Sequence, residues 1–270
     1  MDLSIDLIRK SSIKGILKLQ LKYQRLIRRS LDWGLGITSA ATIFCLWLLT
    51  FILICRVDLA SLSIWAIALI ILGRTFLHTG LFIISHDAAH GTVFTPNRRI
   101  NDGIGAIALF IYGLLPYQKF LTNHGLHHKY PASDQDPDFH DGRHSSMVAW
   151  YLSFMFRYID RRQSLILFVG MTILFHGIRI GFDIPALNLL LFWILPLLLS
   201  SMQLFYFGTY LPHRGQVFSD RHHARSSNFS LLISFLTCYH FGYHWEHHEH
   251  PHLPWFRLPL ARKNPKHKLI

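Results

Sequence analysis

Histidines gather in three short clusters whose spacing suits metal binding. The clusters are His86 and His90 in HDAAH, His124, His127 and His128 in HGLHH, and His244, His247 and His248 in HWEHH. Residues three or four apart share one face of a helix, so each cluster would aim its imidazoles in one direction. Eight imidazoles exceed the four ligands that a zinc ion usually takes, which predicts two metal ions. Imidazole suits iron, copper, zinc and nickel, so ligand type alone does not choose the metal.

Two more histidines stand close to these clusters in the sequence. His213, in YLPHR, ends a long apolar run at the edge where the clusters must meet, and this position predicts a ninth ligand. His240 precedes His244 by four residues, so we expect it on the same helical face. His240 would then be either a tenth ligand or a hydrogen-bond partner that fixes the tautomer of a ligand ring.

Acidic residues beside the clusters are candidates to accept hydrogen bonds from imidazole N–H groups. They are Asp87, Asp136, Asp138, Glu246 and Glu249. The alternative is that they are solvated loop charges. For Asp136 and Asp138 we favour a structural role or a role in gating a substrate.

Four apolar segments are long enough to cross a membrane, at about residues 35–54, 63–85, 165–183 and 187–211. Twenty residues without a charge, as in the first segment, span a bilayer core of about 30 Å. A helix over residues 63–90 would reach about 42 Å and carry the first histidine cluster out of the bilayer. Residues 104–115 are apolar but too short to span, which predicts a re-entrant or interfacial hairpin closed by Pro116. We therefore expect an all-α integral membrane protein with about four transmembrane helices and a histidine-rich cap.

The basic residues predict the domain limits and the orientation. Residues 1–33 combine Lys and Arg with Leu and Ile, as in an amphipathic helix on an anionic membrane surface, although a solvated tail is the alternative. Residues 34–270 would form one membrane domain. The net charge of +12 lies between apolar runs, which argues against a nucleic-acid binder. Three basic regions, residues 1–30, 85–163 and 212–270, hold eight Lys or Arg each. With four spans, these regions share one side with the histidines and both termini, and the positive-inside rule makes that side cytoplasmic.

The three clusters, in this order and around four apolar segments, resemble the membrane fatty acid desaturase and hydroxylase superfamily. The resemblance covers roughly Leu35 to Leu258. Within that superfamily, four stretches are similar to the beta-carotene ketolase group: SHDAAHGTVF at 85–94, residues 112–142, LFYFGTYLPH at 204–213 and residues 238–255. The elements DPDFH and GTYLPH are the most specific of these.

The resemblance implies two iron ions (Fe2+), O2 as cosubstrate and an external electron donor, usually ferredoxin. The implied iron ligands are His86, His90, His124, His127, His128, His213, His244, His247 and His248. The implied reaction is a double hydroxylation at ring C4 of beta-carotene followed by dehydration, which gives echinenone and then canthaxanthin. Thr209 departs from the asparagine that acyl-CoA desaturases carry one turn before the ligand matching His213, so a water-mediated metal contact there is in doubt.

Other functions fit the same residues. A carotenoid beta-ring hydroxylase or an acyl-lipid desaturase would use the same scaffold and metal. A metal carrier would also need histidines, but ionisable residues would then line the spans instead of lying at their ends. A non-catalytic membrane binding protein is the remaining class.

Overall fold

The computed structural model describes residues 31–215 and 221–262. Regular structure in these residues is helical throughout, without a β-strand, and the predicted all-α fold is confirmed. The expected basic segment lies outside the described residues except for its last three positions, which begin the first long helix.

Four helical stretches are long and apolar enough to cross a membrane, as predicted. The first is the Leu31–Ile54 helix, the second is α2 (Ile64–Ala89) and the third is α6 (Arg161–Gly181). The fourth runs from Ala186 to His213 and is assigned in five pieces: α7 (Ala186–Leu189), η2 (Leu190–Ile194), α8 (Leu195–Phe205), η3 (Tyr206–Tyr210) and α9 (Leu211–His213). Both η2 and η3 are π-helical turns, which often occur at functional sites.

A bent pair of helices stands where the sequence predicted a short re-entrant hairpin. α3 (Arg98–Gly113) and α4 (Tyr117–Lys129) meet at 102°. α3 begins before the apolar stretch because the Asn97 side chain accepts hydrogen bonds from two backbone N–H groups in its first turn. It ends where Leu114 adopts a left-handed conformation with φ of 54°. The bend directs α4 and its histidines toward the end of α2.

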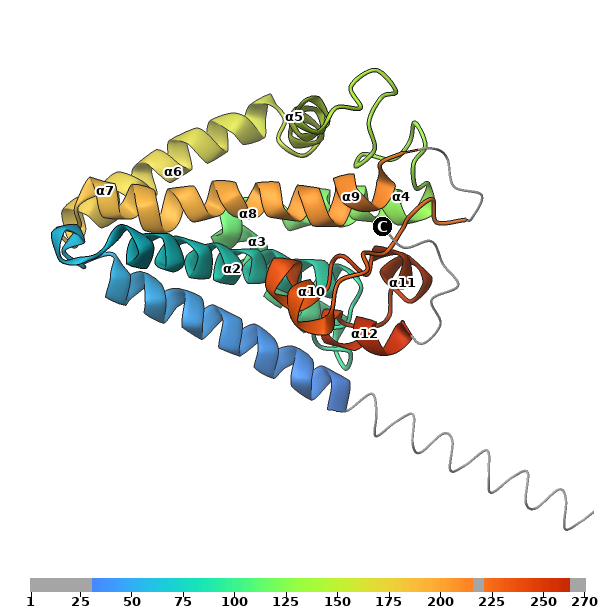
Figure 1. Cartoon of the computed structure of the whole chain (residues 1–270), viewed down its shortest axis with the longest axis horizontal. Coiled ribbons are helices and arrows are strands. Elements are labelled where there is room, and N and C mark those ends of the chain that lie inside the picture. The colour runs from blue at the N-terminus through green and yellow to red at the C-terminus, as the bar shows by residue number, and fades with distance from the viewer. Residues whose placement is uncertain (1–30, 216–220, 263–270) are drawn as a thin grey trace, which may run out of the picture.

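The central helix of the bundle is α2, which packs against both α3 and α8 (Figure 1). A buried arginine ties it to the neighbouring spans. The Arg74 guanidinium donates hydrogen bonds to the carbonyls of Phe192 and Trp47 and to the Thr50 hydroxyl. These bonds join the first, second and fourth spans at a position where an unpaired charge would be costly.

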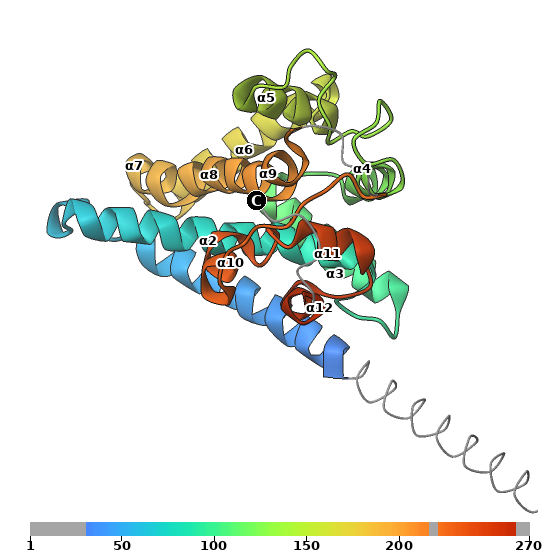
Figure 2. The same cartoon turned by 45° about the vertical axis from the view of Figure 1, so that its right-hand side comes forward.

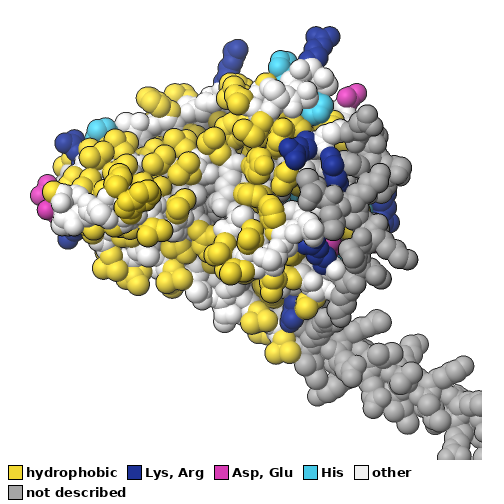
Figure 3. Space-filling model, viewed as in Figure 1, with side chains coloured by type: hydrophobic (Ala, Val, Ile, Leu, Met, Phe, Trp, Pro, Cys, Tyr) yellow, Lys and Arg dark blue, Asp and Glu magenta, His cyan; other side chains and the backbone are white. Residues whose placement is uncertain are grey.

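Short helices form a cap at one end of the bundle. They are α5 (Met147–Tyr158), α10 (Leu231–Cys238), α11 (His244–Glu249), η4 (Trp255–Arg257) and α12 (Leu258–Ala261). Figure 2 shows α11 beside the ends of α2, α4 and α9, so the C-terminal part of the chain closes over the helices that carry the histidine clusters. The long helices expose many apolar side chains, and few Lys or Arg side chains lie among them in Figure 3.

Candidate metal centre

The histidine clusters lie on helix ends that converge from four parts of the chain. His86 is in the last turn of α2 and His90 caps its end. The second cluster lies in α4 and the third in α11, so the helical spacing predicted for both is confirmed. His213 ends α9, as the sequence indicated. Because α11 begins at His244, all three of its cluster residues share one short helix.

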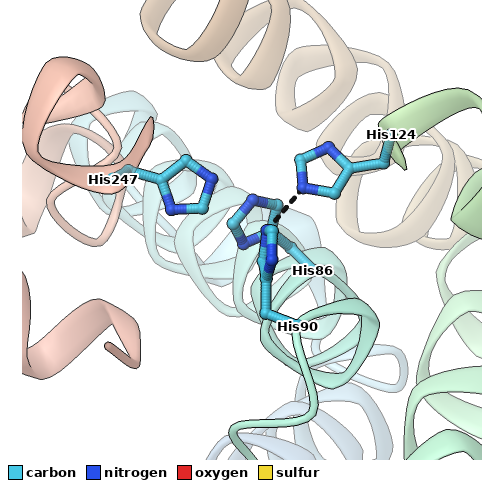
Figure 4. Close-up of side chains that lie close together, drawn as sticks. All are labelled: His86, His90, His124 and His247. Carbon is cyan, nitrogen blue, oxygen red and sulfur yellow. Dashed lines mark hydrogen bonds between the residues drawn. The ribbon is translucent and has the colours of Figure 1, made fainter. Parts of the chain in front are cut away.

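The structure brings eight of the nine predicted histidine ligands together in two groups of four. The first group contains His86, His90, His124 and His247, and their ligand atoms all lie within 4.8 Å of one another. In Figure 4 these four rings face a common centre from three elements, and the dashed line joins His90 Nε2 to His124 Nε2, which are 2.7 Å apart. Three of the four side chains are buried.

The second group contains His127, His213, His244 and His248, again within 4.8 Å of one another and all buried. The His213 and His244 Nε2 atoms are 2.9 Å apart. His248 Nε2 lies 3.0 Å from the Nε2 atoms of both His127 and His244. Four nitrogens therefore point into one small volume.

His128, the remaining predicted ligand, lies between the groups. Its Nε2 atom is 2.9 Å from His247 Nε2 in the first group. Its ring stacks on His248 of the second group, with centroids 4.3 Å apart. His128 can thus approach an ion in either group.

The nitrogen spacing suits ligands that share an ion. With a metal–nitrogen bond of about 2.0–2.1 Å, two nitrogens at right angles or at a tetrahedral angle lie about 2.9–3.4 Å apart. The measured separations within the second group, 2.9 to 3.4 Å, fall in that range. An all-imidazole set of this kind fits divalent iron, copper, zinc or nickel and does not fit hard ions such as magnesium or calcium.

The outer nitrogens of two rings have hydrogen-bond acceptors. His127 Nδ1 lies 3.0 Å from Asp136 Oδ1, and His213 Nδ1 lies 2.9 Å from the carbonyl oxygen of His223. An acceptor at Nδ1 keeps the proton on that atom and leaves the Nε2 lone pair free for a metal. His223 takes part through its backbone carbonyl, which no pattern of side chains in the sequence could indicate.

The other acidic candidates contact different partners. Asp87 Oδ1 is 3.5 Å from His86 Nδ1, and Asp87 Oδ2 accepts a hydrogen bond from the backbone N–H of Trp255. Asp138 Oδ2 is 3.9 Å from His127 Nδ1, and Asp138 Oδ1 accepts a hydrogen bond from the Tyr158 hydroxyl at 2.5 Å.

Glu246 and Glu249 were candidates to accept hydrogen bonds from the predicted ligand rings, but both have other partners. Glu246 accepts a hydrogen bond from the Ser226 hydroxyl and so ties α11 to the preceding loop. Glu249 Oε2 is 2.8 Å from His222 Nε2 and also pairs with Arg221. His222 is thus held beside the site, with its ring centroid 5.7 Å from that of His248.

The expectation that His240 shares a helical face with His244 is wrong. His240 lies in the turn before α11 and has a positive φ of 65°, so four-residue spacing has no helical meaning there. Its Nδ1 atom is 3.1 Å from the Ser234 hydroxyl, and its ring stacks on Tyr243. It belongs to neither histidine group.

Most of the predicted ligand rings outside the spans are held neutral, whereas at His127 burial is outweighed by the carboxylates of Asp136 and Asp138, which raise its pKa to about 9. Burial, together with the nearby Arg98 and His127, lowers the pKa of His90 to about 4. Burial and the neighbouring imidazoles hold the pKa values of His244, His247 and His248 well below the ordinary value near 6.5. Neutral rings at pH 7 offer the lone pairs that metal binding needs.

A cavity opens onto both histidine groups, and the space between its walls, its open side included, is about 760 Å³. It reaches His86 and His124 of the first group and His127 and His244 of the second. Its other walls are mainly aromatic and aliphatic: Phe82, Tyr112, Leu115, Phe120, Phe154, Met155, Ile159, Leu204 and Phe241. Asp138, Tyr158, Ser201 and Thr209 supply its other polar groups. Such a lining suits a bulky apolar molecule with one end at the histidines.

Most of the cavity wall could not be found from sequence motifs. Phe241, whose ring centroid is 4.6 Å from that of His86, is an aromatic residue without a distinguishing spacing. Tyr158 ends α5, which contains none of the histidine clusters. The only available signal was that both lie near a cluster or near the DPDFH element.

The model of the fatty acid desaturase family matches residues 61–269, which include all the histidines of both groups. A beta-carotene ketolase of Paracoccus sp. (strain PC1) is 41% identical over 238 residues, covering 84% of this chain and 95% of the relative. A second beta-carotene ketolase, from Paracoccus sp. (strain N81106 / MBIC 01143), is 44% identical over 208 residues, with coverage of 76% and 82%. A zeaxanthin 4-ketolase of Chlamydomonas reinhardtii is 36% identical over 246 residues, with coverage of 84% and 53%. No solved structure gives a significant match.

Proposed function

Because the chain belongs to the fatty acid desaturase family, we propose that it is a beta-carotene 4-ketolase, an O2-dependent oxygenase with two iron ions. The observation that carries the proposal is the apolar cavity that ends at histidines of both groups. Relatives named as beta-carotene ketolases, matched over most of their length, support the choice of substrate and product.

Nine histidines would hold the iron pair. The first group would hold one ion and the second group the other, with His128 at the shared boundary. When bound, the irons supply the activation of O2 and the removal of hydrogen from ring C4. Asp136 and the carbonyl of His223 keep the rings of His127 and His213 oriented with Nε2 toward the metal.

The protein would contribute positioning and the exclusion of water. The aromatic walls of the cavity would hold a beta-ring so that C4 faces the histidines, and their apolar surface keeps bulk water out. Each round consumes O2, two electrons and two protons, and it converts a C–H bond to C–OH with release of water. A second round at the same carbon gives a geminal diol, which loses water to form the ketone.

The electrons must come from an external donor, and we propose ferredoxin. We further propose that residues 34–270 form one membrane domain, with the histidines and both termini on the cytoplasmic side. The three basic regions of the sequence support this orientation. That the basic segment lies along the membrane surface stays a prediction from the sequence, except that its last three residues, 31–33, begin the first long helix.

Expression in a beta-carotene-producing cell, followed by chromatography of the pigments, tests the function. We expect echinenone and canthaxanthin, and we expect both to disappear with His247→Ala. Alcohols without ketones would indicate a ring hydroxylase, and new double bonds in fatty acids would indicate a desaturase. A metal carrier is disfavoured because the histidines of the two groups belong to α2, α4, α9 and α11 and gather where these helices meet, instead of being spread along the spans.

A further inference from the structure

A second apolar depression lies on the membrane-facing side of the bundle, between α6 and the fourth span. It has an empty volume of about 1130 Å³. One wall is a stripe along α6 formed by Ser164, Leu167, Phe168, Met171, Thr172, Phe175 and His176, and the other is formed by Leu190, Ile194 and Leu197. We call this depression the α6 groove. In Figure 1, α6 departs from the line of α8 on its way to α5, which leaves the two helices splayed.

The α6 groove lies next to the cavity at the histidines. Ile159, in the turn between α5 and α6, lines both spaces. On the opposite wall, Leu197 lines the groove, whereas Ser201 and Leu204, four and seven residues later on α8, line the cavity. Residues at this spacing share one helical face, so one face of α8 runs from the groove into the cavity.

The lining of the groove suits an apolar occupant. It contains no Lys, Arg, Asp or Glu. The Thr172 hydroxyl donates its hydrogen bond back to the carbonyl of Phe168 at 2.7 Å, so it does not seek a ligand acceptor. From Ser164 to His176 the α6 wall is about 18 Å long, because a helix rises about 1.5 Å per residue.

We propose that the α6 groove binds the polyene chain of the carotenoid while one ring occupies the cavity at the histidines. This inference rests on the proposed carotenoid substrate. A carotenoid is a rigid conjugated rod with a ring at each end, so it cannot coil into a single cavity. Once one ring faces the histidines, the rest of the rod must leave along an apolar path, and the α6 groove is the neighbouring apolar surface, which shares Ile159 with the cavity. The groove opens to lipid, so the substrate can enter sideways from the bilayer.

A matched pair of substitutions on α6 tests the proposal. Thr172→Trp places an indole in the groove, whereas Ile173→Trp adds an indole on the neighbouring position, which is 65% exposed and does not line the groove. Both full-length variants would be assayed in lipid nanodiscs with beta-carotene, O2 and a reduced donor. The ring compound beta-ionone, which has no polyene rod, would serve as a competitive inhibitor that fills the cavity alone.

We expect Thr172→Trp to raise KM for beta-carotene at least tenfold, with the inhibition constant of beta-ionone unchanged within twofold. Ile173→Trp should behave as wild type. Equal kinetics in the two variants would overturn the proposal that the groove binds the polyene chain, and would favour an ordinary membrane lipid as the occupant of the groove. If beta-ionone failed to inhibit the wild type, or no longer inhibited Thr172→Trp, the idea that the cavity binds the ring and the groove binds the chain would be overturned. A wild-type protein that forms no ketone would instead refute the proposed function.

Discussion

Asp136 offers the sharpest test of how the protein prepares its metal site. Its two carboxylate oxygens accept four contacts from three donors: His127 Nδ1 at 3.0 and 3.1 Å, the N–H of Ala132 at 2.8 Å and the N–H of Asp138 at 2.8 Å. The two backbone donors approach different oxygens. Asn at this position has the same shape but only one accepting oxygen, so in either orientation one backbone N–H faces an NH2 group.

The expected cost of Asp136→Asn follows from that geometry. A buried donor left without an acceptor costs about 1–3 kcal/mol. Losing the charged partner of a ligand histidine typically weakens metal binding by about 10- to 100-fold. We therefore expect Asp136→Asn to fold, to lose iron at a chelator concentration about 10- to 100-fold lower than wild type requires, and to lose ketolase activity in parallel.

The assay is iron content per chain, measured by elemental analysis after equilibration with increasing chelator, together with ketone formation. Asp141→Asn is the matched control, because Asp141 lies in an exposed loop and pairs with the exposed His144. An Asp136→Asn protein that retains iron and activity like Asp141→Asn would refute a role of Asp136 in holding His127.

Four further outcomes are expected. Purified wild-type protein should contain about two irons per chain, and chelation should abolish ketone formation and lower the melting temperature; one tightly bound ion per chain would contradict two separate groups. Gly208→Ala should cut the rate about tenfold, because its Cβ would meet Phe241 Cδ2 at 2.8 Å, whereas Gly177→Ala, which has open space, should leave the rate unchanged. Arg74→Met should lower the free energy of unfolding by about 2–3 kcal/mol through loss of charged hydrogen bonds between spans, measured by thermal unfolding in detergent; an unchanged melting temperature would argue against that role. Since the rod would place its second ring far from the histidines, one binding event, in which two rounds of O2 consumption form one ketone, should release only the monoketone; diketone formed without release and rebinding of the substrate would count against the groove.

The sequence alone determined the helical fold, the spans and the histidine clusters. Each of these is a local property. Long apolar runs must form helices in a bilayer because backbone groups have no other partners there, and three- and four-residue spacing fixes which side chains share a helical face. For that reason the spans and the helices bearing HGLHH and HWEHH could be predicted without knowledge of any contact.

Only the tertiary structure decided how the histidines are grouped. His127 and His128 are adjacent in α4 and point about 100° apart around the helix axis. His127 consequently joins His213 of α9, whereas His128 reaches His247 of α11. Spacing also misplaced His240. Its distance of four residues from His244 suggested a shared helix, but His240 lies in a turn with positive φ outside that helix. The walls of the cavity and of the α6 groove come from helices far apart in the chain, and no periodicity in the sequence records which faces of those helices meet.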